Sequence, residues 1–123
     1  MMTGVVNAAL EASLRLSMED THGQVHEVEA ILDTGFNGFL TLPSAVIRAL
    51  GLPWRYRQQG QLADGNFRVL DVFAATILWD GQRRTVEVEA LDAQPLIGMA
   101  LMRRYELRVH VKSGGVVTIA GAP

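Results

Sequence analysis

The sequence predicts a mostly β protein, a small closed or two-layer barrel with one or two short helices, and three observations support this. Apolar and polar residues alternate along most of the chain, as they do in half-buried strands. Twelve glycines among 123 residues exceed the usual share and suit turns between short strands. Only two stretches have helical spacing. Apolar types make up 49% of the chain, enough for a real core, and the length fits one domain over residues 1–123.

The first expected hairpin lies near the N-terminus. Apolar residues at every second position from Leu14 to Met18 predict one strand. Gly23 then allows a turn, and the alternating segment Val28–Leu32 returns and runs into Asp33. Two later hairpins are expected around Asp80-Gly81, which is a strong turn signal, and around the glycine-rich segment 113–115. Their strands are predicted at 77–79 and 86–90, and at 108–111 and 116–119.

Two short helices are expected. The first begins at Pro43 or Ser44 and ends before Gly51, because proline favours the first helical turn and glycine the position after the last. The second is expected over about Met99–Arg104.

Composition and charge exclude several function classes. The formal net charge is −2, and Lys112 is the one lysine among eleven scattered basic residues, so nucleic acid and anionic membrane are not expected partners. Without cysteine there is no disulfide, thiolate nucleophile or cysteine metal site. His22 and His26 lie in a predicted hairpin, so no metal is expected. No signal peptide or membrane-spanning stretch is expected, and the protein is predicted to be soluble and cytoplasmic.

The segment Ile31–Gly35 is the strongest candidate for chemistry. An apolar strand ends at Asp33, and Thr34 and Gly35 follow at once, so a carboxylate stands where the chain turns sharply. A strand-terminal aspartate that only caps a turn gives the same triplet, and an isolated Asp-Thr-Gly is more often of that kind. The rest of the sequence decides between these two interpretations.

A second motif, Leu96-Ile97-Gly98, follows roughly sixty residues later, with a short helix and two closing strands predicted beyond it. In this order and spacing, Asp-Thr-Gly and the second motif resemble the retropepsin-like aspartic proteases, which include retroviral proteases and small bacterial relatives. The likeness spans roughly residues 10–119. It implies the acid-protease barrel of a single lobe, in which Leu96 and Gly98 pack next to the Asp-Thr-Gly loop.

The resemblance implies an aspartic endopeptidase that uses neither a metal nor a cofactor. Such enzymes hold a water molecule between two carboxylates, of which one acts as general base and the other as general acid. The two carboxylates share a proton, because two like charges about 3 Å apart cannot both ionise easily, as is established for this family. The sequence has one Asp-Thr-Gly, so the expected enzyme is a homodimer with both copies of Asp33 on the two-fold axis. The family pattern gives Thr34 a hydrogen bond across the axis, and Gly35 leaves room around the dyad.

The segment Gln59–Val69 is predicted to form a hairpin with Ala63-Asp64-Gly65 at its tip. In the resembled family such a hairpin, the flap, closes over an extended peptide and excludes water. The resemblance therefore implies a peptide or protein substrate in a largely apolar groove. The residues expected to bind it are Phe36, Leu40, Leu62, Ala63, Asp64, Gly65 and Ile97.

One position departs from the family pattern. Alanine or serine often follows Asp-Thr-Gly in the family, whereas this chain has Phe36. An aromatic side chain there would narrow the groove or pack into the core. The departure motivates an alternative, a catalytically inactive peptide-binding module that holds an extended segment by strand addition on the same fold. A structural dimer without a ligand is a third interpretation.

Overall fold

The computed structural model describes residues 1–61 and 64–123, and these residues form one ten-stranded sheet and one short helix. The mostly β expectation is therefore confirmed. Helix α1, Ser44–Leu50, lies between the fourth and fifth strands. The strands are β1 Met2–Val6, β2 Ala12–Glu19, β3 Val25–Leu32, β4 Leu40–Leu42, β5 Trp54–Gln61, β6 Phe67–Trp79, β7 Gln82–Ala90, β8 Leu96–Ile97, β9 Tyr105–Val109 and β10 Val116–Gly121.

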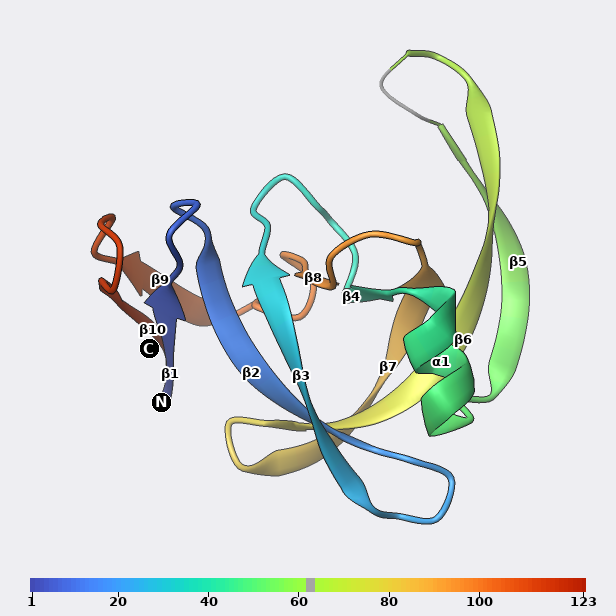
Figure 1. Ribbon diagram of the computed structural model, residues 1–123, viewed down its shortest axis with the longest axis horizontal. Coiled ribbons are helices and arrows are strands. Elements are labelled where there is room, and N and C mark those ends of the chain that lie inside the picture. Colours follow the sequence, from blue (N-terminus) through green and yellow to red (C-terminus); the bar gives the residue numbers. More distant parts are fainter. Residues whose placement is uncertain (62–63) are drawn as a thin grey trace.

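The sheet has the strand order β5-β6-β7-β4-β8-β3-β2-β1-β10-β9, and β6 also pairs with β2. This additional pairing places Met18 opposite Ile77 and bends the sheet, so that the strands from β6 to β2 form a ring. Figure 1 shows both termini at one end of the molecule, beside β9 and β10. The hairpin of β5 and β6 projects from the other end.

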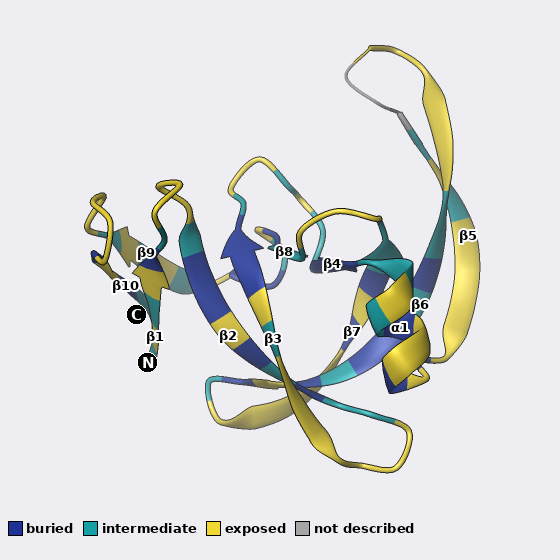
Figure 2. Cartoon of the chain, in the orientation of Figure 1, coloured by how far each residue is buried: buried dark blue, intermediate teal, exposed yellow. Residues whose placement is uncertain are grey.

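The hydrophobic core lies inside the curled sheet, because alternate residues of its strands point there. Leu16, Met18, Ile77 and Val88 are each at most 1% exposed. Helix α1 adds Ile47 and Leu50 to the same core. Figure 2 shows this burial along β2, at the end of β3 and in the second half of β6, whereas most of β5 and the turn between β2 and β3 are exposed. Among the described residues, no helix is long and apolar enough to cross a membrane.

The two helix predictions have different outcomes. Helix α1 begins after Pro43 and ends at Gly51, whose φ of 65° is left-handed, as the sequence predicts. The helix expected over 99–104 was wrong, because this segment forms turns. The carbonyl of Gly98 accepts hydrogen bonds from the backbone of Leu101 and Met102, and Arg104 then adopts a φ of 70°. That left-handed residue directs the chain into β9 before a second helical turn can form.

Several strands differ from the expected elements. The segment 54–57, for which no strand was predicted, belongs to β5 and pairs with β6. The strand expected to reach Val111 ends at Val109. The strands β1 and β4 were not predicted. For β4 the reason is its length, because its three residues are all buried and show no alternation.

The shortest strand, β8, joins the two sides of the ring. It pairs in parallel with β3, which places Leu32 beside Ile97, and antiparallel with β4, which places Leu40 beside the same residue. The backbone N–H of Gly98 donates to the carbonyl of Phe39 at 3.0 Å. A Cβ atom at Gly98 would collide with the carbonyl oxygen of Gly38. Only glycine therefore permits this close approach of the two segments.

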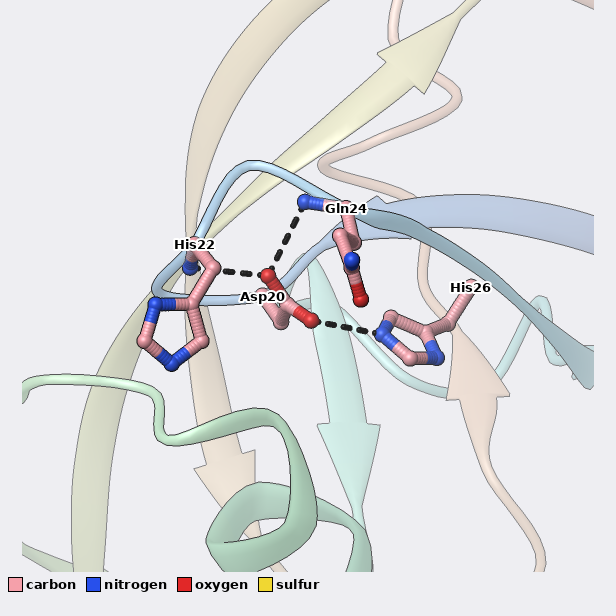
Figure 3. A network of polar contacts seen from close by, with 4 residues as sticks. All are labelled: Asp20, His22, Gln24 and His26. Atoms are coloured by element: carbon pink, nitrogen blue, oxygen red, sulfur yellow. Dashed lines mark hydrogen bonds and ion pairs between the residues drawn. The ribbon is translucent and has the colours of Figure 1, made fainter.

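An aspartate organises the turn between β2 and β3 (Figure 3). One carboxylate oxygen of Asp20 accepts the backbone N–H groups of His22 and Gln24, and the other lies 2.8 Å from Nε2 of His26. These contacts hold the pKa of Asp20 below its ordinary value of 3.8, and the hydrogen bond with His26 has the largest effect. The neighbouring Thr21 donates its backbone N–H to the carbonyl of Leu50, so the turn is docked on the end of α1.

The close approach at β8 gives the first testable expectation. Gly98→Ala places a methyl group against the Gly38 backbone, so it should lower the free energy of unfolding by about 1–3 kcal/mol or more. Gly121→Ala is the matched control, because a Cβ there meets nothing within 4 Å, and it should change stability by less than about 0.5 kcal/mol. Urea unfolding of both variants measures this. Equal stability of the two variants would show that the contact does not constrain the fold.

The Asp20 turn predicts how the stability of the fold depends on pH. Because the folded-state pKa is depressed, Asp20 stabilises the fold above its unfolded pKa, and this stabilisation is lost as pH falls through the folded pKa. Asp20→Asn should therefore lower Tm at pH 7, and the difference from wild type should shrink as pH falls below about 3.8. Thermal melts of both proteins across this range test it. A Tm difference that does not vary with pH would contradict the stated role of the charge.

Candidate active site

The Asp33 loop, residues 33–39, connects β3 to β4 and begins where β3 leaves the core. Its first residue donates its backbone N–H to the carbonyl of Ile97 at 2.9 Å. Further along, the carbonyls of Phe36 and Gly38 accept the backbone N–H groups of Met99 and Ala100, at 2.8 and 3.1 Å. The loop is thus fastened along its length to the segment that follows β8.

The Asp33 side chain closes a tight turn with one of its two oxygens. Oδ1 accepts the backbone N–H of Gly35 at 2.8 Å, and the Asp33 carbonyl accepts that of Phe36 at 3.2 Å. Within the described residues, no hydrogen bond reaches Oδ2 of Asp33 or the hydroxyl of Thr34. Asp33 is half-buried, and Thr34 and Gly35 are exposed. Turn capping therefore accounts for Oδ1 of Asp33, whereas Oδ2 is available to a further partner.

The Phe36 ring folds back over its own loop. It is half-buried, and its nearest atoms would lie 2.6 Å from a Cβ at Gly38 and at the same distance from one at Gly98. The ring therefore occupies the space that these two glycines leave open. The ring packs on its own loop and against Gly98, and it does not belong to the hydrophobic core cluster of the described residues.

The apolar residues expected near the site lie below the loop. Leu40 and Ile97, which the sequence analysis places in the groove, are both 0% exposed and belong to the core. A ligand bound at the surface of the chain cannot contact these buried side chains, so both residues support the Asp33 loop from within the core. Leu96 is half-buried, and its backbone N–H donates to the Thr41 hydroxyl at 3.0 Å.

The expected flap corresponds to the hairpin of β5 and β6. Their pairing runs to Gln61 opposite Phe67. Of the predicted tip, Leu62 and Ala63 lie outside the described residues. Asp64 accepts hydrogen bonds from the backbone and the side chain of Asn66, at 2.9 and 3.0 Å, and Gly65 has a φ of 88°. In Figure 1 the hairpin and the Asp33 loop, between β3 and β4, both extend toward the top of the view.

A carboxylate that the sequence analysis missed lies between this hairpin and the Asp33 loop. Glu89 of β7 accepts a hydrogen bond from the side-chain amide of Gln58 in β5. Its Oε2 would lie 3.0 Å from a Cβ at Gly38. Glu89 is half-buried, and burial raises its pKa, with the charge of Glu87 adding to the rise. Alternation in β7 marks Glu89 as outward-facing, but nothing local reveals that the Asp33 loop lies above it.

Other parts of the described chain do not form an evident site. The described residues contain no group of three or more His, Cys, Asp or Glu side chains that could hold a metal ion. One surface hollow is lined by Asp20, Leu52 and Arg83, and another by Tyr56 and Glu87. Asp33 lines neither of these two hollows.

Comparison with known proteins gives a structural likeness without a sequence match. No protein-family model matches the chain, and no curated protein matches it. Among solved structures, the chain is similar to a retropepsin-like aspartic protease from Rickettsia conorii, with a TM-score of 0.55 and 13% sequence identity. The similarity covers 98% of this chain and 92% of that protein. The chain therefore has a retropepsin-like fold over nearly its whole length.

Proposed function

We propose that the chain is one subunit of a homodimeric aspartic endopeptidase. The observation that carries this proposal is the position of Asp33, a carboxylate in a rigidly fastened surface loop with one oxygen already bound within its own turn. One carboxylate is half of the machinery that metal-independent peptide hydrolysis by this route needs. The likeness to a retropepsin-like protease supports a second copy of the chain as the source of the other half.

The proposed mechanism follows from the loop geometry. A water molecule lies between Oδ2 of Asp33 and its symmetry mate, and the two carboxyl groups carry one proton between them. The ionised group removes a proton from the water, which attacks the peptide carbonyl carbon, and the protonated group donates its proton to the carbonyl oxygen. When the C–N bond breaks, the group that took the proton from the water gives it to the leaving amine, and the proton on the former carbonyl oxygen returns to the other carboxylate. The bond from Gly35 N–H to Oδ1 fixes the carboxylate plane during this transfer. The exposed Thr34 hydroxyl makes the contact across the axis.

The hairpin of β5 and β6 supplies the cover in this proposal. Phe67 and Val69 are 66% and 61% exposed on its arm, so the hairpin presents apolar surface that an extended peptide can bury. Leu62, Ala63, Asp64 and Gly65 form its proposed contact with substrate, and Phe36 forms part of the groove wall beside Asp33. Closure over the peptide would exclude water from the reacting groups.

The alternative function is a peptide-binding module without turnover. It is favoured by the Phe36 ring, which covers the glycines beside Asp33 where smaller residues leave more space in the resembled family. This module would hold the same extended peptide under the same hairpin. One observation distinguishes this module from a protease: the bound peptide would be recovered intact.

Removal of the Asp33 charge tests the catalytic role. Asp33→Asn should lower cleavage of a denatured protein at mildly acidic pH by roughly 100-fold or more, because the amide can act neither as general base nor as general acid. Glu27→Gln is the control, since Glu27 is an exposed residue of the same strand, and its rate should match wild type. Equal cleavage by wild type and Asp33→Asn would exclude Asp33 as the catalytic group.

The homodimer gives a separate expectation. Light scattering at micromolar concentration should give a mass of twice 13.4 kDa. When wild type is mixed with an equal amount of Asp33→Asn under exchange, random pairing leaves about one quarter of dimers with two aspartates, so total activity should fall to about half. Activity that stays unchanged after mixing, or a monomer that cleaves peptide, would contradict a site shared between subunits.

A further inference from the structure

Glu89 is a half-buried acid that lies next to both the β5–β6 hairpin and the Asp33 loop. Its Oε1 accepts from Gln58 of the β5–β6 hairpin, and its Oε2 reaches the Asp33 loop at Gly38. In the sheet, Glu89 stands opposite Thr41 of β4 on one side and opposite Val72 of β6 on the other. Both neighbours are buried. The carboxylate therefore lies at the foot of the hairpin, where a peptide under it would pass.

The charge of Glu89 is incompletely compensated within the chain. Its hydrogen-bond donor is the neutral amide of Gln58, and none of the ion pairs among the described residues includes Glu89. Removal of a carboxylate from water is unfavourable unless a cation or several donors replace the lost hydration. Burial accordingly raises the pKa of Glu89, and the nearby charge of Glu87 adds to the rise. A cation placed at Oε2 would relieve both effects.

The basic residue next to Gln58 in the hairpin, Arg57, is engaged with another acid. Arg57 of β5 lies 2.9 Å from Asp71, which also accepts from the indole of Trp54. Arg57 and Gln58 are adjacent in an extended strand, so their side chains point to opposite faces of the sheet. On the face that carries Gln58, β5 has no basic residue from Tyr56 to Gly60, and Arg68 of β6 stands opposite Gly60, further toward the hairpin tip. A guanidinium or ammonium group from outside the chain would complement the Glu89 carboxylate.

We infer that Glu89 forms a subsite for an arginine or lysine side chain of the substrate, close to the bond that is cut. This inference rests on the proposed peptidase function and adds to it a substrate class, peptides with a basic residue near the scissile bond. The hydrogen bond from Gln58 holds the carboxylate at the foot of the hairpin, and Oε2 receives the cation. Glu87 serves as the comparison, because it is exposed and its carboxylate accepts from the hydroxyl of Tyr56 at 2.8 Å.

The test compares cleavage of matched peptides. Each peptide of a set carries one arginine, or norleucine in its place, at one of several positions on either side of the scissile bond. The ratio of kcat/KM for arginine over norleucine should reach about 10- to 100-fold at one position for wild type, as expected of a charge-assisted hydrogen bond. Glu89→Gln should bring this ratio close to one, and Glu87→Gln should keep it. An arginine preference that Glu89→Gln leaves intact, or no preference in wild type, would overturn the subsite.

The same peptides separate failure of the subsite from failure of the protease. Cleavage of the norleucine peptides by wild type reports the proposed function whatever the role of Glu89. If no peptide is cleaved, the endopeptidase proposal fails. The affinities of fluorescein-labelled arginine and norleucine peptides for wild type and Glu89→Gln are then compared in place of kcat/KM. Tighter binding of the arginine peptide that depends on Glu89 would support the subsite on a binding module, and equal binding or no binding would overturn it.

Discussion

The backbone hydrogen bonds of β8 are the constraint on which the rest of the structure depends. This strand of two residues lies between β3 and β4 and fixes both ends of the Asp33 loop, through Asp33 N–H to the Ile97 carbonyl and Gly98 N–H to the Phe39 carbonyl. Without it the ring would be open between β3 and β4, because no other described strand joins them. The absence of a Cβ at Gly98 permits this approach, so one glycine determines where the carboxylate stands.

Strands long enough to alternate could be predicted from the sequence, and strands defined by distant partners could not. The segments of β2, β3 and β7 show a period of two, and α1 has proline and glycine at its ends, so local chemistry specifies them. Strands β4 and β8 have three and two residues, too few to show a period, and their pairing joins segments far apart in the chain. Asp33 was proposed from its motif, whereas Glu89 has no local signal, because the parallel pairing of β7 with β4 is what brings it beneath the Asp33 loop.

The site combines a rigid part with an exposed part, and this division suits the proposed chemistry. The carboxylate of Asp33 is oriented by its own turn before any substrate arrives, which reduces the reorganisation needed in the reaction. The hairpin of β5 and β6 extends from the edge of the sheet, and the side chains of Tyr56 and Gln58 join its base to β7 across β6. Substrate contacts can therefore change in the hairpin and at Glu89 without displacing Asp33. Phe36 belongs to the rigid part, because its ring fills the space over Gly38 and Gly98.

The central claim is that two copies of this chain complete one active site. The most direct measurement is the distance between the two Asp33 carboxylates in a crystal structure of the assembly formed in solution. The account predicts that their nearest oxygens lie about 3 Å apart across a two-fold axis, within reach of one shared proton and one water molecule. Asp33 loops on opposite sides of the assembly, with the carboxylates facing solvent, would contradict it.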